Sequence, residues 1–483
     1  MELDPRVRRP ALTVLFGGSP PRMLRLSRRG AELVSAMGSA AVGGAESARL
    51  ARRLTDHGIG IPRPGPRNAP VDVTVVVPVR DRTLELGDCL AALGTRHRVL
   101  VVDDGSADPD AVVASCRLHG ADLVRRVRPG GPAAARNTGL RAVTSELVAF
   151  CDSDCLPGPG WIEDLAGHFV DPLVVGVAPR IVAASSGRGL SLVDQGVHPA
   201  PVHLGSAVPF VPAAAVVFRR APLGDGFDET LRYGEDVDLV WRLAEAGWRV
   251  RYEPGVTVAH RDPTGVVARL RRRFGYGTSA GPLERAHPGA IDHLSVGLGP
   301  ACTLGGLIVG APGTALLAWA LTALRLRGQL RPLGLGTRSA LEVALAQVIH
   351  AWVGLGRWCT IFGVPLAAGM VLGRRRRRAR RVRTLLLLSS GSALLARRSG
   401  PGGAARRVLV DDCLGEMAYG VGVLASCARS GVLGPLVPRV RRVRSAAAPR
   451  DRCDGTAGGA RQGAGVLLRR AARTVSSFSA RRA

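Results

Sequence analysis

Two aspartates separated by one residue follow a short apolar run near the middle of the chain. Residues 147–151 are apolar, and Asp152 and Asp154 come directly after them. Side chains alternate along an extended segment, so both carboxylates can project the same way from the end of a buried strand. In open α/β sheets that end is where ligands bind. Paired carboxylates there can hold a divalent cation, which in turn holds a diphosphate; an acidic turn that serves only solubility is the alternative.

The elements that must position these aspartates alternate between strands and helices. Runs rich in β-branched residues at 71–79, 98–102 and 123–127 are typical of strands, and the run before Asp152 is the fourth. Helices are expected between them, the last at residues 132–142. This alternation over short connections predicts an α/β fold with a doubly wound, mostly parallel sheet.

Five motifs occur in a fixed order through this region. They are residues 75–79 (VVVPV), 101–106 (VVDDGS), 131–139 (GPAAARNTG), 152–154 (DSD) and 234–239 (GEDVDL). This series resembles the family 2 glycosyltransferases, which have the GT-A fold. With a short leading region and an apolar C-terminal region, the whole chain is similar to the glycosyltransferases of the mycofactocin system.

The resemblance implies the transfer of glucose from a nucleotide sugar, UDP-glucose. The acceptor would be a redox cofactor derived from a ribosomal peptide, on which a β-1,4-linked glucose chain is built. The resemblance also implies a divalent metal, Mg²⁺ or Mn²⁺, that offsets charge on the departing diphosphate. A single displacement would convert an α-linked donor into a β-linked product.

The donor pocket is expected at the ends of the strands. Asp104 ends the second strand, where an acceptor-only carboxylate can recognise a uracil N–H group; an ordinary acidic turn residue is the alternative. Pro78 and Asp81 would line the same nucleotide pocket. Arg136 lies among small residues and can reach a phosphate or the carboxylates, unless it is only a surface charge.

Catalysis needs a base at the acceptor hydroxyl, and the acidic cluster at residues 235–238 supplies the candidates. Asp236 is the preferred base, Glu235 is its substitute, and Asp238 is expected to be structural. Carboxylates at a helix start also cap free N–H groups and face the helix dipole. Three acids in four positions exceed that need, so we expect the base to draw the proton from the hydroxyl as its oxygen attacks the anomeric carbon.

The family pattern places Asp152 near the ribose and sugar and Asp154 on the metal. His260 ends a strand-like run at residues 256–260, where relatives often carry a metal-binding histidine. A satisfied core or surface histidine is the alternative.

A basic segment with interleaved aromatic residues follows at 269–277. It occupies the place of the Gln-x-x-Arg-Trp motif of processive relatives, which lies over the acceptor and the diphosphate. Arg273 and Tyr276 are therefore expected to contact phosphate or sugar. The motif itself is absent, so the resemblance does not extend to long-chain processivity. A charged helix that touches anionic headgroups is the alternative.

Residues 1–70 are expected to form a small α+β domain and a proline-rich linker. Strand-like runs at 12–16 and 23–26 predict a hairpin, Ser27 can cap a first helix, and residues 46–57 predict a second. This pattern resembles the winged-helix domains of the PqqD type, which bind leader peptides of modified ribosomal peptides. A purely structural cap is the alternative.

Residues 293–438 are predicted to be an apolar, helical, membrane-associated region. Residues 294–324 carry no charge, enough for one span of about 20 residues, and a second apolar stretch at 343–372 is broken by Arg357. The arginines at 374–381 favour the cytoplasmic face, where a nucleotide-sugar enzyme also belongs. Spanning helices, interfacial helices and a buried helical domain all remain open.

The length and composition limit the number of domains, the kind of partner and the cellular setting of the protein. The length of 483 residues suggests two or three domains. The expected parts are residues 1–70, 71–292 and 293–438, followed by an arginine-rich tail at 439–483 that is predicted to be disordered. The net charge of +28 comes from arginine alone, which reflects compositional bias in part and suits anionic partners. Nine cysteines without paired spacing argue against a disulfide framework or a zinc site and favour a reducing, cytoplasmic setting; no signal peptide is evident.

Two other functions remain. A lipid-linked or cell-wall glycan as acceptor would keep the same fold and chemistry. A winged-helix nucleic-acid-binding protein would use the arginine-rich chain, but it leaves the five strand-end motifs unexplained. No nucleic-acid partner is therefore expected.

Overall fold

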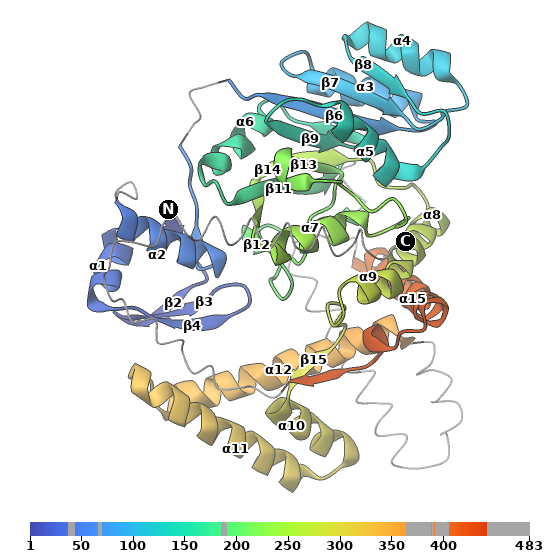
Figure 1. Cartoon of the computed structure of the whole chain (residues 1–483). Coiled ribbons are helices and arrows are strands. Elements are labelled where there is room, and N and C mark those ends of the chain that lie inside the picture. Colours follow the sequence, from blue (N-terminus) through green and yellow to red (C-terminus); the bar gives the residue numbers. More distant parts are fainter. Residues whose placement is uncertain are drawn as a thin grey trace, which may run out of the picture. The chain divides into compact units, whose positions relative to one another are not determined.

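A nine-stranded sheet occupies the middle of the chain, with helices on both of its faces (Figure 1). The computed structural model describes residues 1–36, 44–65, 70–184, 191–363, 388, 391 and 405–441. Residues Met1–Arg441 belong to one unit.

Four neighbouring strands of the sheet are parallel, as the sequence predicted. In spatial order they are β8 (Asp122–Arg125), β7 (Arg98–Asp103), β6 (Val73–Val79) and β9 (Leu147–Cys151). Every residue of β6 and β9 is buried, because a strand with helices on both faces has no solvated side. Their carboxyl ends meet at one edge of the sheet, which brings the predicted site residues together.

The other half of the sheet is mixed, so the sheet is less regular than the predicted doubly wound arrangement. The strand next to β9 is β13 (Ala215–Arg219), which is antiparallel to both β9 and β11 (Val174–Ala183). The described part of the connection between β11 and β13 contains no helix. Antiparallel strands can be joined in this way, whereas parallel strands need a crossover connection that usually contains a helix. Beyond β11 lies β14 (Arg249–His260), parallel to it. The short strands β10 (Cys155–Pro157) and β12 (Ala200–Val202) pair antiparallel with β14.

Helices on the two faces bury separate apolar cores. They are α3 (Thr83–Leu93), α4 (Pro109–His119), α5 (Gly131–Ala142), α6 (Trp161–Ala166) and α7 (Glu235–Glu245). Successive residues of β6 serve opposite faces, with Val76 in one core and Val77 in the other. Gly139 lets α5 approach the sheet closely, because a Cβ there would overlap the Val76 side chain.

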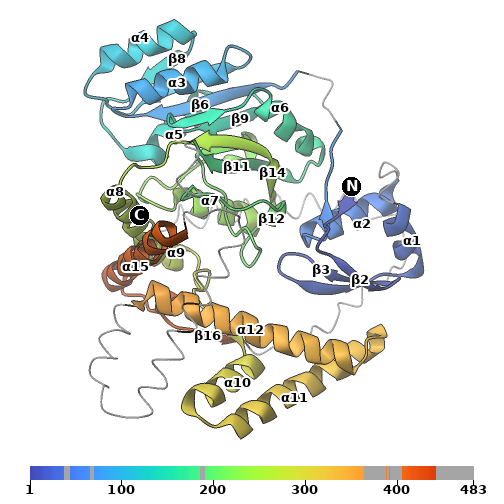
Figure 2. The ribbon, with the colours of Figure 1, turned by 180° about the vertical axis from the view of Figure 1, so that it is seen from behind.

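The N-terminal region contains the predicted hairpin and two helices (Figure 2). Strands β3 (Val14–Gly17) and β4 (Arg22–Arg25) form the hairpin, and β2 (Arg8–Ala11) adds a third strand. Helices α1 (Arg28–Ala36) and α2 (Ala45–Asp56) follow, and Ser27 Oγ accepts the Gly30 N–H as the predicted cap. The strands β1 (Glu2–Leu3) and β5 (Gly60–Ile61) pair with each other. Leu15, Leu54 and Ile59 form the centre of a separate small core.

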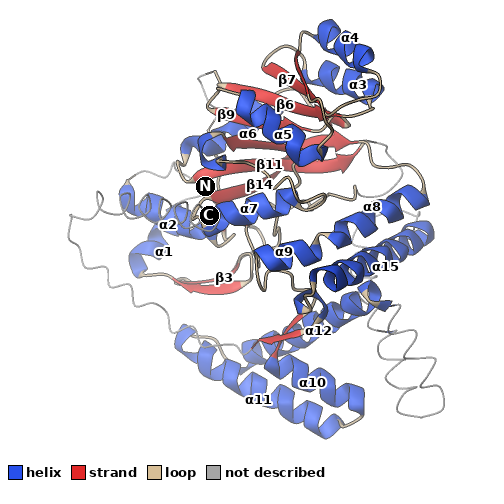
Figure 3. Ribbon diagram, turned by 45° about the vertical axis from the view of Figure 1, so that its right-hand side comes forward, coloured by secondary structure: helices blue, strands red, loops and turns tan. Residues whose placement is uncertain are grey.

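The C-terminal helices include one that returns to pack against the helices that follow the central sheet. After α8 (Val266–Thr278) and α9 (Ala280–Ala286) come β15 (Ser295–Gly297), α10 (Leu298–Val309), α11 (Pro312–Leu330) and α12 (Thr337–Ile361). Helix α15 (Ala405–Ser430) then lies alongside α8 (Figure 3), and β16 (Arg439–Arg441) pairs with β15. The predicted boundary at residue 292 thus falls between segments that are in contact.

The predicted apolar stretches correspond mainly to α10, α11 and α12. Among the described residues one helix, α12, is long and apolar enough to cross a membrane. Residues 364–372 of the second predicted stretch, the arginines at 374–381 and residues 442–483 of the predicted tail lie outside the described residues.

Candidate active site

A large cavity of about 2600 Å³ lies at the carboxyl ends of the parallel strands. The ends of β6, β7 and β9 and the start of α5 form one side. Helices α7, α8 and α15 and the end of α12 form the other. Most of the predicted site residues line it: Pro78, Asp104, Arg136, Asp152, Asp154, Glu235, Asp236, His260, Arg273 and Tyr276.

The two aspartates after β9 have different surroundings. The Asp152 carboxylate accepts a hydrogen bond of 2.7 Å from Arg136 and keeps part of its surface open to the cavity. Asp154 is 6% exposed. Its carboxylate makes an ion pair with Arg82 and lies 3.5 Å from His260 Nε2. Asp152 is therefore the more open of the two carboxylates. Asp154 is more enclosed and lies beside the basic side chains of Arg82 and His260.

Arg136 joins the two acidic motifs of the site. Its guanidinium donates to Asp152 Oδ1 at 2.7 Å and to Glu235 Oε1 at 2.8 Å, and it lies over the Phe227 ring. Burial alone would lower the pKa of Arg136, but these carboxylates raise it overall. The side chain is 4% exposed, so the alternative of a surface charge is wrong.

Asp236 has the titration behaviour that a general base needs. It begins α7, where its carboxylate accepts the N–H groups of Val237 at 2.8 Å and Ala213 at 3.3 Å. Burial, and then the charge of Glu235, raise the pKa of Asp236 to about 7, although Arg136 acts to lower it. A carboxylate with that pKa is half ionised near neutral pH and can take a proton there.

The third acid of this cluster has a structural environment. Asp238 is paired with Arg242 at 2.7 Å and with His287 Nε2 at 3.0 Å. It does not line the cavity, in agreement with the structural role expected for it.

Two side chains of the cavity that could hold a divalent metal ion are Asp154 and His260, since the carboxylate of one lies 3.5 Å from Nε2 of the other. Within the described residues, no three side chains of His, Cys, Asp and Glu are gathered closely enough to hold a metal by themselves. His260 Nδ1 lies 3.3 Å from Asp262 Oδ1, while Nε2 faces Asp154. A carboxylate behind the other ring nitrogen is the usual arrangement of a metal-binding histidine. Burial alone would lower the pKa of His260, but Asp262 and Asp154 raise it.

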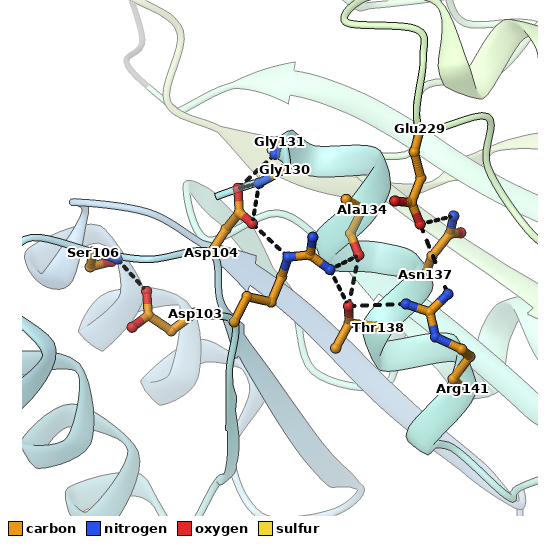
Figure 4. A network of polar contacts seen from close by, with 11 residues as sticks. Asp103, Asp104, Ser106, Gly130, Gly131, Ala134, Asn137, Thr138, Arg141 and Glu229 are labelled. Carbon is orange, nitrogen blue, oxygen red and sulfur yellow. Dashed lines mark hydrogen bonds and ion pairs between the residues drawn. The ribbon is translucent and has the colours of Figure 1, made fainter. Parts of the chain in front are cut away.

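Asp104 organises the loop that leads into α5. Its carboxylate accepts the backbone N–H groups of Gly130 and Gly131 and the Nε–H of Arg126, at 2.7–2.9 Å. Figure 4 shows this network, with Asp103 held separately by the Ser106 N–H group. Asp104 therefore shapes the pocket wall through protein contacts, a role that the sequence did not indicate.

Asp81 is the one donor-pocket candidate that does not line the cavity. Its carboxylate accepts the Ala107 N–H at 2.7 Å, and its own N–H donates to Ser106 Oγ at 3.0 Å. Asp81 therefore ties the loop after β6 to the loop after β7. Its neighbours Arg80 and Arg82 reach the cavity instead.

On α8 the sequence reasoning missed Arg272. Arg272 lines the cavity; burial acts to lower its pKa, but the Tyr276 phenol and the carboxylates of Asp154 and Asp152 raise it overall. Arg273 instead lies against α15 at Gly415. Burial raises the pKa of Tyr276 to about 12, and its ring meets that of Tyr233 edge to face. Adjacent arginines on a helix point in different directions, and the sequence alone does not show which side of the helix faces the cavity.

Comparisons with known proteins agree with this arrangement. Residues 74–220 match the family described as glycosyl transferase family 2. The pre-mycofactocin glycosyltransferase of Mycobacterium tuberculosis is 42% identical over 347 residues, which cover 69% of this chain and 68% of that relative. The succinoglycan biosynthesis protein ExoU of Rhizobium meliloti is 29% identical, over 38% of this chain and 60% of its own length.

Among solved structures, the mannosyltransferase PcManGT from Pyrobaculum calidifontis, in complex with GDP-Man and Mn2+, is 21% identical with a TM-score of 0.38. That alignment covers 70% of this chain and 90% of the mannosyltransferase. The identity of 42% over more than two thirds of the mycobacterial enzyme shows that the chain is a glycosyltransferase and belongs to glycosyl transferase family 2, together with the pre-mycofactocin glycosyltransferase.

Proposed function

We propose that the protein is a metal-dependent, inverting glucosyltransferase that uses UDP-glucose. The observation that carries this proposal is the convergence of two acidic motifs on one cavity. Arg136 bridges Asp152 and Glu235, and beside them Asp236 has a pKa of about 7. A donor clamp and a base within one cavity are what a direct glycosyl transfer requires.

On the donor side, Pro78, Asp104 and Asp152 would line the nucleotide and sugar positions. Arg136 and Arg272 would balance the negative charge of the diphosphate. Asp154 and His260 would hold Mg²⁺ or Mn²⁺, which when bound offsets charge on the departing nucleoside diphosphate. The proximity of Asp154 and His260, and the position of Arg272 in the lining of the same cavity, support these assignments.

On the acceptor side, Asp236 would take the proton from the acceptor hydroxyl as that oxygen bonds to the anomeric carbon. The bond from the anomeric carbon to the diphosphate oxygen breaks in the same step, and its electron pair leaves with the nucleoside diphosphate. Attack from the opposite face inverts the centre, so an α-linked donor gives a β-linked product. Glu235 already accepts from Arg136, which favours Asp236 over Glu235 as the base.

The acceptor would be the peptide-derived cofactor precursor named for the mycobacterial relative, extended by β-1,4-linked glucose. The identity of 42% over most of both chains supports this choice. Residues 1–70 would form a separate peptide-binding domain of the PqqD type, because a three-stranded sheet with two helices suits that role. Residues 71–292 would be the catalytic domain.

A lipid-linked or cell-wall glycan is the second candidate acceptor, favoured by the apolar surface of the C-terminal helices. Leu317, Leu321 and Leu324 of α11 and Leu345 and Ile349 of α12 are each more than half exposed. Single exposed leucines are ordinary, but such a set on adjacent helices is typical of a membrane contact. We propose that this region, residues 293–438, attaches the enzyme to the cytoplasmic face of the membrane.

Incubation of the purified protein with UDP-glucose, other nucleotide sugars and Mn²⁺ or Mg²⁺ tests the proposal. Release of nucleoside diphosphate should require UDP-glucose and a divalent cation, and Asp154→Ala should abolish it. Equal release in the presence of a chelator would contradict metal dependence, and a preference for another nucleotide sugar would contradict the proposed donor.

A further inference from the structure

Helix α15 packs so closely against α8 that glycine is required where the two helices touch. A Cβ on Gly277 of α8 would overlap the carbonyl oxygen of Tyr419, and one on Gly422 of α15 would overlap that of Phe274. The two helix backbones therefore touch directly. Ser426 Oγ donates to the Thr278 carbonyl at 2.6 Å and accepts the Gly281 N–H at 2.8 Å. These contacts make α15 a rigid wall.

Helix α15 and its neighbours contribute polar side chains to the cavity. These side chains are far apart in the sequence from the residues of the donor side. Glu416 and Tyr419 of α15, Arg357 near the end of α12 and His293 before β15 all line the cavity. Glu416 is 5% exposed. These four residues are called the C-terminal cluster below.

Hydrogen bonds fix the orientation of the Tyr419 hydroxyl. His293 Nδ1 lies 2.8 Å from the Pro435 carbonyl oxygen, so Nδ1 must carry a hydrogen. Burial lowers the pKa of His293, so the ring is neutral at pH 7 and Nε2 is an acceptor. The Tyr419 hydroxyl therefore donates to Nε2, at 3.1 Å. The lone pairs of the Tyr419 oxygen remain able to accept hydrogen bonds from a ligand.

The size of the cavity leaves room for more than a nucleotide sugar. Small-molecule sites commonly enclose about 300–1,000 Å³, whereas this cavity measures about 2600 Å³. The C-terminal cluster combines a carboxylate, a guanidinium and a phenol oxygen. Hydrogen-bond acceptors and donors that line one cavity can bind the hydroxyl groups of a sugar ring.

We propose that the C-terminal cluster is an acceptor subsite that binds a glucose residue already attached to the acceptor. This inference rests on the proposed glucosyl transfer. It gives the C-terminal region a role in acceptor selection, because α15 and the end of α12 then hold the sugar chain whose terminal hydroxyl is presented to Asp236.

Binding of p-nitrophenyl β-cellobioside, a β-1,4-linked glucose disaccharide, to the full chain tests this inference without turnover. The affinity, measured by calorimetry or NMR titration, should fall at least about fivefold in Glu416→Gln and in Tyr419→Phe, the scale of one lost hydrogen bond. Glu342→Gln is the matched control, because Glu342 lies on α12 in an exposed ion pair with Arg338, outside the cavity. Unchanged binding in both cluster variants, with unfolding temperatures like that of the wild type, would overturn the subsite.

Kinetics separates the subsite from the proposed function. The same two variants should raise KM for the disaccharide while KM for UDP-glucose stays unchanged. A parallel rise of both KM values would overturn the inference, because it would indicate a general distortion. A wild-type protein that binds the disaccharide but never consumes UDP-glucose would refute the proposed function and leave the sugar-binding cluster standing.

Discussion

The two sides of the cavity are built in different ways. The donor side is built mainly from the ends of β6, β7 and β9, where Asp104 and Asp152 directly follow the strands that position them. The other side comes from α8, the end of α12 and α15, so that Arg273 of α8 and Gly415 of α15 lie together although they are far apart in the sequence. Local motifs therefore reveal the donor side, whereas the acceptor side follows only from how distant helices pack.

Asp236 lies between the two sides, so its loss should have the largest effect on turnover. In Asp236→Asn the carboxylate that would accept the proton becomes a neutral amide. We expect kcat to fall by about 10²–10⁴-fold while UDP-glucose still binds, because Arg136, Asp152 and Asp154 are unchanged. Nucleoside diphosphate release and donor titration measure the two effects.

The exposed Asp225 supplies the control for this change. Asp225→Asn should retain the wild-type rate. A near-normal kcat in Asp236→Asn would move the base elsewhere, and Glu235→Gln would then be the variant to test.

Substitution of Arg136 tests how much the stability of the donor side depends on this one buried cation. In Arg136→Met the buried Glu235 and the adjoining Asp152 lose the guanidinium that joins them. Removal of one partner from a buried ion pair costs about 3–5 kcal/mol, which we expect as a lower free energy of unfolding in urea. Arg141→Met on the same helix is the control, since Arg141 makes an exposed ion pair with Glu229 at 3.9 Å. Equal losses in the two variants would contradict the bridging role.

The difference between local motifs and distant packing also explains which parts of the fold and of the site could be predicted from the sequence. The four parallel strands, the helix at residues 132–142 and the Ser27 cap depend on apolar runs and end signals within a few residues, and all are present. The antiparallel placement of β13 depends on pairing with residues remote in sequence. Arg272 was missed because two adjacent arginines cannot be distinguished without the helix phase, and the partners of Asp104 lie on another loop.

The pH dependence sharpens the assignment of the base. Because the pKa of Asp236 is raised to about 7, most of this carboxyl group is protonated below pH 7 and cannot accept a proton. We expect kcat/KM to rise about tenfold per pH unit up to pH 7 and then to level off. The free enzyme profile, measured at saturating metal, tests this.

A second variant distinguishes Asp236 from His260, whose pKa is also raised. Asp236→Glu moves the carboxylate and should shift the acid limb of the profile. A limb that stays in place would assign the titration to another group, and a flat profile from pH 5 to 8 would contradict the raised pKa.

The smallest expected effect tests the acceptor side by itself. In Gly277→Ala the new methyl group meets the Tyr419 carbonyl oxygen, so α8 and α15 must separate, at a cost of about 1–3 kcal/mol in unfolding free energy. The displaced Tyr419 should weaken binding of the β-1,4-linked disaccharide more than binding of UDP-glucose, because Asp104, Asp152 and Asp154 of the donor side follow strands and not α8. Gly305→Ala is the matched control: a Cβ there meets no atom within 4 Å, so the substitution should stabilise α10 by about 0.5–1 kcal/mol. If Gly277→Ala changed donor and acceptor binding equally, the two sides of the cavity would be one mechanical unit, and the separation drawn here between strand-end motifs and helix packing would fail.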